Sequence, residues 1–188
     1  LYMPKNATGK LPAIAVSGPF GAVKEQASGL HTQELAKRGF LTIAFDPSFT
    51  GESGGQPRYV ASPDINTEDF SAAVDYLSTR DDVNPEQIGI LGICGWGGLA
   101  INAAAIDTRI KATVAATMYD ISRCTANGYF DAADNTDARY GMRQTLNAQR
   151  TEDYRNGTYA LAGGVVDPLP ADAPQFVKDY HAYYKKER

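Results

Sequence analysis

Cys94 stands at a turn where a thiol could act as a nucleophile. It lies in the segment GICGWGG (92–98), between the apolar run 87–93 and the alanine-rich segment 99–105. This pattern predicts a strand that turns sharply into a helix, with the cysteine at the turn. A helix N-terminus offers free backbone N–H groups and the positive end of the helix dipole, and both favour a thiolate. The N–H of Gly95 would then be available to stabilise an oxyanion.

Two other interpretations of this segment remain open. A free cysteine at the end of a core strand can be a small buried hydrophobic residue without chemistry. The segment GWGGLA (95–100) also fits the GxGxxA fingerprint of dinucleotide-binding proteins, with Asp120 lying 25 residues after Gly95, where about 20 is usual. That fingerprint normally opens its domain, whereas here two predicted strand-helix units precede it.

A cysteine nucleophile usually needs a histidine as its base, and the sequence holds only two. His31 lies on a predicted helix, where a surface or half-buried position is the simpler interpretation. His181 follows Cys94 and Asp120, which matches the chain order nucleophile, acid, histidine. It lies inside an amphipathic helix, however, and not on a loop that leaves a strand.

Asp46 and Asp120 each follow a predicted buried strand. The carboxyl ends of strands are where open α/β sheets place their chemistry. A loop or helix-cap role is the simpler interpretation for both aspartates. Spacings typical of metal sites, such as HxxxH or CxxC, do not occur, so the sequence predicts no metal.

The loop GPFGA (18–22) follows the first predicted strand and should lie beside Cys94. Pro19 has no N–H, which leaves Phe20 or Gly21 as a second donor to an oxyanion. A turn chosen only for its backbone shape is the alternative. Trp96 is expected to form a pocket wall or to pack on the next strand.

These residues would be positioned by alternating strands and helices. Helix ends are marked by Lys37-Arg38-Gly39, with cations in the last turn and a glycine after it, and by Asn66 as the expected N-cap of the second helix. Such alternation predicts a parallel sheet covered by helices on both faces. The expected strands are 11–17, 40–45, 87–93 and 110–118, and the expected helices are 24–38, 67–79 and 97–106.

The pattern changes after residue 120. Residues 121–188 contain one weak strand candidate, 159–166, and a last helix over 174–187 with an apolar stripe at spacings of three and four. We therefore expect a core over residues 1–120 and a helical cap or lid over 121–188. The stripe consists of Phe176, Val177, Tyr180, Tyr183 and Tyr184.

Composition limits the possible partners. The 188 residues are 43% hydrophobic, enough for one substantial core, and carry a net charge of −4. Without a basic surface, nucleic acids and anionic membranes are poor partners, so a small molecule is expected. The two cysteines are too few for a disulfide framework. No apolar run approaches the ~20 residues of a membrane span. The first residues do not have the pattern of a signal peptide. These features favour a soluble, cytoplasmic protein over an exported one.

The chain resembles a bacterial α/β-hydrolase family related to dienelactone hydrolases and acetyl xylan esterases. The resemblance covers most of residues 1–120 and implies an α/β-hydrolase fold with a helical cap. Its motifs are VKEQASGL (23–30), LAKRGFLTIAFD (35–46), GESGG (51–55), DVNPEQIGILGICGWGG (82–98) and IKATVAATMYD (110–120).

Dienelactone hydrolases use a cysteine in a GxCxGG elbow, so the resemblance implies Cys94 as nucleophile. It implies an oxyanion hole from Gly95 and Phe20, with Gly21 and Trp96 beside the substrate. Two departures matter: Trp96 stands where a glycine is usual, and Gly18 stands where dienelactone hydrolases carry a glutamate. Lactone specificity and glutamate-dependent activation therefore do not carry over.

The expected function is cofactor-free hydrolysis of an ester, thioester or lactone through Cys94. The alternatives are a dinucleotide-dependent oxidoreductase that uses the glycines of 95–98, and a non-catalytic binding protein with this fold. The fold normally continues after its cap, and the resemblance implies that the acid and the histidine lie there. We therefore expect these residues to be an incomplete fragment of the domain, with a missing or separate C-terminal segment that supplies both.

Overall fold

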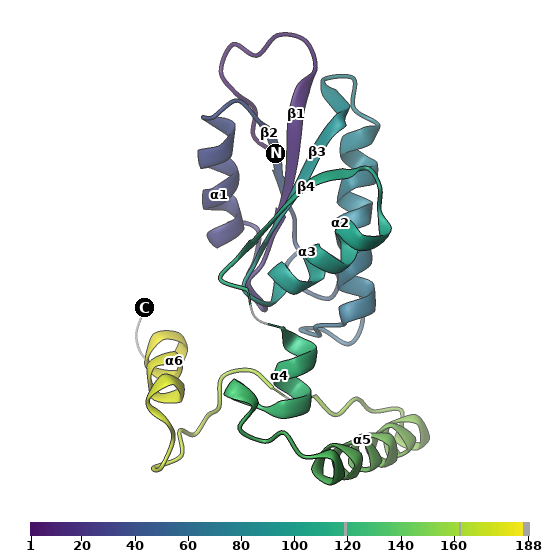
Figure 1. The fold of residues 1–188 in the computed structure, drawn as a ribbon, viewed down its shortest axis with the longest axis vertical. Coiled ribbons are helices and arrows are strands. Elements are labelled where there is room, and N and C mark those ends of the chain that lie inside the picture. Colours follow the sequence, from purple (N-terminus) through teal and green to yellow (C-terminus); the bar gives the residue numbers. More distant parts are fainter. Residues whose placement is uncertain (119, 162, 186–188) are drawn as a thin grey trace. The chain divides into compact units, whose positions relative to one another are not determined.

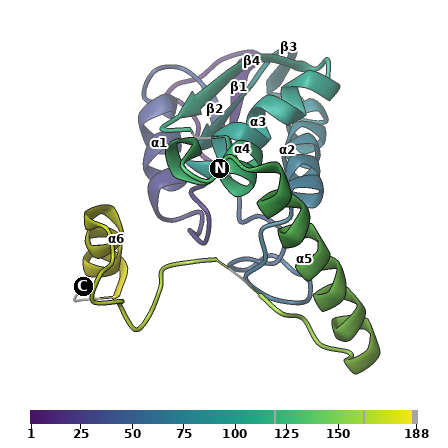
Figure 2. The ribbon, with the colours of Figure 1, turned by 60° about the horizontal axis from the view of Figure 1, so that its bottom comes forward.

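The computed structural model describes residues 1–118, 120–161 and 163–185. Its parallel sheet has the strand order β2-β1-β3-β4, and helices connect consecutive strands. Figures 1 and 2 show α1 on one side of the sheet and α2 with α3 on the other. The predicted α/β architecture is confirmed. The elements are β1 (Leu11–Ser17), α1 (Ala27–Ala36), β2 (Leu41–Ala44), α2 (Pro63–Ser78), β3 (Val83–Ile93), α3 (Gly95–Ile106) and β4 (Ile110–Ala116).

The two central strands, β1 and β3, bury both of their faces. Side chains alternate across a strand, so neighbouring residues enter different hydrophobic clusters. Ala15 of β1 packs in a cluster with Phe70 of α2, whereas the next residue, Val16, packs in a second cluster beside Leu35 of α1. The continuous apolar runs of the sequence therefore arise because helices cover both sides of these strands.

The start of α2 differs from the prediction. The helix begins at Pro63, which suits a first turn because proline has no N–H to satisfy there. Asn66 is thus one turn inside the helix, and its predicted role as the N-cap is wrong. Its side-chain oxygen instead accepts the backbone N–H of Ser62 at 2.8 Å.

The strand β4 is less buried than predicted. Residues 111–115 are exposed. For Val114, 53% of the residue's surface is accessible to solvent. The expectation that β4 is a buried strand is wrong, because β4 lies at the edge of the sheet and pairs with β3 alone among the described strands. The sequence of β4 is as apolar as that of an inner strand, although β4 lies at the edge of the sheet.

The chain divides into two compact units, Leu1–Met142 and Arg143–Arg188. The first unit includes α4 (Ile121–Asn127) and η1 (Tyr129–Asp131), and the second includes α6 (Gln175–Lys185). The boundary falls within α5 (Thr136–Asn156). The division into a core and a cap at residue 120 stays a prediction.

The C-terminal residues contain one of the two elements that the sequence predicts there. The described residues of 159–166 form no strand, so that candidate is wrong. The last helix is confirmed as α6, although its expected end at 186–187 and the side chain of Tyr184 lie outside what the structure describes. Within the described ranges, none of the helices has the length and apolarity needed to cross a membrane.

Candidate active site

The sheet has a switch point between β1 and β3. From β1 the chain passes to β2 on one side, and from β3 it passes to β4 on the other. The connections after β1 and β3 therefore leave in opposite directions, which opens a crevice at the carboxyl ends of these two strands. The loop 18–26 and the turn at Cys94 are the two segments that leave the sheet there.

Cys94 occupies the turn between β3 and α3. Its backbone has φ 61° and ψ −128°, a conformation that residues with a Cβ rarely adopt. Its N–H donates to the Ala116 carbonyl of β4 at 2.9 Å, and its own carbonyl accepts the N–H of Gly97 at 2.9 Å. The thiol is partly buried. Strained positions of this kind gather at active sites, so the backbone supports the chemistry predicted from the sequence.

Two glycines make this turn possible. A methyl group on Gly92 would overlap the backbone carbonyl of Trp96, because α3 crosses β3 very closely at this point. A methyl group on Gly95 would overlap the ring of Phe20. Gly95 is the first residue of α3, so its N–H has no acceptor within the helix. This is the N–H that the sequence predicts as a donor to an oxyanion.

The loop 18–26 meets the turn through Phe20. The Phe20 ring is partly buried, packs against the main core cluster and lies against Gly95. The structure therefore brings together three of the predicted site residues, Cys94, Gly95 and Phe20. Gly21 is exposed, has φ 72° and has open space around the position of a side chain.

Trp96 has a packing role. Only 1% of its surface is exposed, and its ring lies edge-on to Phe70, with centroids 5.4 Å apart, and to Phe45 at 6.1 Å. The expectation that it lines a substrate pocket does not fit this burial. The large side chain anchors the first turn of α3 in the core instead.

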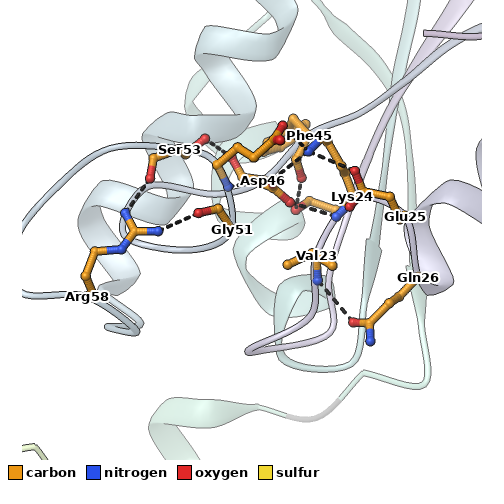
Figure 3. A network of polar contacts seen from close by, with 11 residues as sticks. Val23, Lys24, Glu25, Gln26, Phe45, Asp46, Gly51, Ser53 and Arg58 are labelled. Atoms are coloured by element: carbon orange, nitrogen blue, oxygen red, sulfur yellow. Dashed lines mark hydrogen bonds and ion pairs between the residues drawn. The ribbon is translucent and has the colours of Figure 1, made fainter.

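A polar network joins the loop 18–26 to the connection after β2 (Figure 3). The Asp46 carboxylate accepts the backbone N–H of Lys24 at 2.7 Å and that of Glu52 at 2.9 Å. The Lys24 ammonium lies 3.0 Å from the same carboxylate. Gln26 has a ψ of −130°, which is not helical, so α1 begins at Ala27 instead of the predicted residue 24, and Lys24 precedes the helix.

The network governs the charge state of Asp46. Burial raises the pKa of its carboxyl, but the two backbone N–H groups and the Lys24 ammonium outweigh burial and lower the pKa below the ordinary 3.8. The ionised Asp46 carboxylate therefore stabilises the folded protein at pH values above 3.8. This stabilisation is lost as the pH falls through the lowered pKa of the folded state. From the sequence, Asp46 is considered as a candidate but Lys24 is not. In the sequence, Lys24 is marked only by its position as a cation near the start of the first helix.

The two histidines lie in different units. The His31 Nδ1 is 2.8 Å from the Ala27 carbonyl, one turn earlier in α1, which confirms the half-buried position predicted for it. In the second unit, the His181 Nε2 lies 3.6 Å from a carboxylate oxygen of Asp167. The His181 Nδ1 is buried and has no hydrogen-bond partner among the described residues.

Asp120 caps a helix, as the simpler interpretation predicted. Its carboxylate accepts the N–H of Arg123 at 2.9 Å and the hydroxyl of Ser122 at 2.6 Å at the start of α4. The Ser122 hydroxyl and the Arg123 N–H lower the pKa of this carboxyl. Asp120 is therefore engaged in local structure and not directed at a ribose.

A family model matches residues 1–181, and it describes X-Pro dipeptidyl-peptidases of the S15 family. In sequence, the protein PA2218 of Pseudomonas aeruginosa is 56% identical over 100% of this chain and 50% of its own length. YcjY of Escherichia coli K12 is 42% identical over 86% of this chain and 53% of its own length. The chain thus spans about half the length of these relatives.

Solved structures agree with the predicted fold. The crystal structure of PA2218 has a TM-score of 0.86 and covers 97% of this chain, which covers 56% of that one. A putative dienelactone hydrolase from Klebsiella pneumoniae has a TM-score of 0.53 at 26% identity, over 63% of this chain and 53% of its own.

A third relative, the thiohydrolase aneE of Aspergillus aculeatus, is 36% identical over 53% of this chain and 31% of its own length. The predicted resemblance to dienelactone hydrolases is confirmed, and a putative acetyl xylan esterase from Bacteroides fragilis shares the fold, with a TM-score of 0.51 at 16% identity. The chain has the α/β-hydrolase fold and belongs to the X-Pro dipeptidyl-peptidase (S15) family.

Proposed function

We propose that the protein hydrolyses an ester, thioester or lactone, with Cys94 as the nucleophile. The observation that carries this proposal is the strained backbone of Cys94 at the β3–α3 turn, at the switch point of the sheet. A side chain held there is directed at a substrate in the crevice and stands at a helix N-terminus. A cysteine that serves only as a core residue has no need of such a conformation.

The chemistry follows the usual two steps of acyl transfer. The Cys94 thiolate forms a bond to the carbonyl carbon, and the carbonyl electron pair moves onto the oxygen. The backbone N–H groups of Gly95 and Phe20 stabilise this oxyanion. The bond to the leaving group then breaks, and the leaving group takes a proton from a general acid. A water molecule attacks the acyl enzyme and releases the acid and the thiol.

The names of relatives support the substrate class. One similar protein is named a thiohydrolase and one solved structure is a putative dienelactone hydrolase. Both names describe hydrolysis, and the second names a lactone. The substrate proposed for this chain is therefore a small molecule with an ester or thioester bond.

We place the acid and the histidine of this reaction on a segment outside these 188 residues. Within the first unit, the His31 Nδ1 is already paired with its own helix. The relatives are about twice as long as this chain, and the outer edge of β4 is exposed. A segment that pairs with β4 would cover this edge and bring polar side chains to the carboxyl end of the sheet.

Labelling of the two cysteines tests the nucleophile. With iodoacetamide below one equivalent at neutral pH, Cys94 is expected to be modified before Cys124, as measured by peptide mass spectrometry. Cys94 precedes the first turn of α3, where N–H groups are free to stabilise a thiolate. Cys124 lies inside α4, where its N–H is bonded to the Asp120 carbonyl. Faster labelling of Cys124 would show that the assignment is wrong.

The oxidoreductase alternative predicts a dinucleotide at 95–98, and the packing argues against it. A pyrophosphate must approach the second glycine of the fingerprint, here Gly97. That side of Gly97 faces Met118 and Ala115, whose Cβ atoms lie 2.8 Å and 3.3 Å from where a methyl group would be. We expect no change in melting temperature with NAD or NADP at about 1 mM, a concentration at the upper end of ordinary KM values. Micromolar binding in a calorimetric titration would favour the oxidoreductase.

A further inference from the structure

We propose that Asp46 is a positioning residue for the loop 18–26 and, through this loop, for the oxyanion site beside Cys94. The inference rests on the proposed function, because it assigns a role in the same reaction. Asp46 follows β2, two strands away from β3, and both oxygens of its carboxylate accept hydrogen bonds from the protein itself.

The Asp46 carboxylate is buried and fully used. Only 2% of its side chain is exposed. One oxygen accepts the backbone N–H of Lys24, and the other accepts the backbone N–H of Glu52 and the Lys24 ammonium. Three donors thus converge on one carboxylate, and they come from two different loops. A buried carboxylate with this many donors holds both loops more firmly than a surface ion pair does.

The connection after β2 forms a rigid support for this carboxylate. The Ser53 hydroxyl donates to the Asp46 carbonyl at 2.7 Å. The Arg58 guanidinium donates to the carbonyls of Ser53 and Gly51, the latter at 2.7 Å. Figure 3 shows Arg58, Gly51 and Ser53 on one side of Asp46 and Lys24 on the other. Asp46 therefore links the loop 18–26 to a segment that is itself tied down.

The link reaches the oxyanion site through Phe20. The loop 18–26 is attached to β1 at one end, and the Asp46 bond to the Lys24 N–H holds the other end just before α1. Phe20 lies between these two attachments, with its ring against Gly95. The position of the Phe20 N–H, the proposed second oxyanion donor, therefore depends on both ends of the loop.

An aspartate is needed for this arrangement, and an asparagine cannot replace it. The side chain of asparagine has one acceptor oxygen and one NH₂ group. In the place of Asp46, its NH₂ would face at least one of the three donors, either a backbone N–H or the Lys24 ammonium. One of the two loops would then lose the hydrogen bond from its backbone N–H. The Lys24 ammonium also lies near Glu25, at 2.9 Å, and Glu52, at 2.7 Å, so its charge would remain partly balanced.

The test is the kinetics of Asp46→Asn on an aryl ester, measured in a preparation that includes the segment proposed to carry the acid and the histidine. We expect kcat to fall about 10- to 100-fold, because a displaced oxyanion donor no longer meets the developing charge. The KM should change less than about threefold, because the donor acts in the transition state. Hydrogen exchange, followed by mass spectrometry, should show faster exchange in peptides that cover 18–26.

Asp69→Asn is the matched control. The Asp69 carboxylate holds the same connection after β2, through the N–H of Ser48 at 3.0 Å and its hydroxyl at 2.6 Å. The donors to this carboxylate are groups of Ser48 and the side-chain NH₂ of Asn66, and none belongs to the loop 18–26 among the described hydrogen bonds. We expect Asp69→Asn to lower the melting temperature while kcat and the exchange of 18–26 stay as in the unchanged protein.

Lys24→Met provides a second variant if Asp46→Asn does not fold. It keeps the backbone N–H and removes one of the three donors, so a fall in kcat of about two- to fivefold is expected. An unchanged kcat in Asp46→Asn overturns this inference if that variant folds. If only Lys24→Met folds, an unchanged kcat in Lys24→Met overturns it. An equal loss in Asp69→Asn also overturns it. Absence of hydrolysis in a preparation that includes the segment proposed to carry the acid and the histidine, or full activity in its Cys94→Ala variant, overturns the proposed function itself.

Discussion

Cys94→Ala is expected to lower the rate of aryl ester hydrolysis at least about 10³-fold when the segment proposed to carry the acid and the histidine is present, because removal of a nucleophile leaves only the oxyanion site and substrate binding. The cause is chemical and not structural, since alanine keeps the Cβ and the strained backbone with φ 61° remains as it is. The release of the aryl alcohol, followed by absorbance, measures the effect. Circular dichroism and the melting temperature should be close to those of the unchanged protein.

Cys124→Ala is the matched control for this experiment. It removes the second thiol of the chain, which is also partly buried and lies inside the helix α4. We expect its kcat and KM to be unchanged. Hydrolysis that survives in Cys94→Ala would show that Cys94 is a structural residue and that another group attacks the substrate.

Gly92→Ala is expected to lower the free energy of unfolding by about 2–3 kcal/mol, because it introduces a side chain into a closely packed contact. The added methyl group would overlap the Trp96 carbonyl and lie 2.9 Å from the Cβ of Ala100. Both belong to α3, which cannot yield without moving away from β3. Urea unfolding, monitored by tryptophan fluorescence, measures the change, since Trp96 is buried beside this contact.

Gly54→Ala serves as the control for the loss of glycine. Gly54 lies in the loop before α2 and has open space around the position of a side chain. Its free energy of unfolding should differ from that of the unchanged protein by less than about 1 kcal/mol. If Gly92→Ala is as stable as this control, the close crossing of α3 over β3 is not important for folding.

The order of elements could be predicted because each buried parallel strand leaves a local pattern. The runs 11–17 and 87–93 are apolar without alternation, since β1 and β3 are covered on both faces. The turn at Cys94 was equally visible, because closely spaced glycines between an apolar run and an alanine-rich segment are typical of a sharp strand-to-helix turn. The burial of β4 could not be predicted in this way, because an apolar run does not show which strand lies at the edge.

The α/β architecture, the turn that holds Cys94 and the glycines that allow it follow from the sequence alone, because periodicity and backbone conformation act over a few neighbouring residues. The packing of Trp96 with Phe45 and Phe70, and the pairing of Lys24 with Asp46 across 22 positions, emerged only in the folded chain. These contacts join residues from different elements. Their partners are chosen by strand order and packing, which no local pattern encodes.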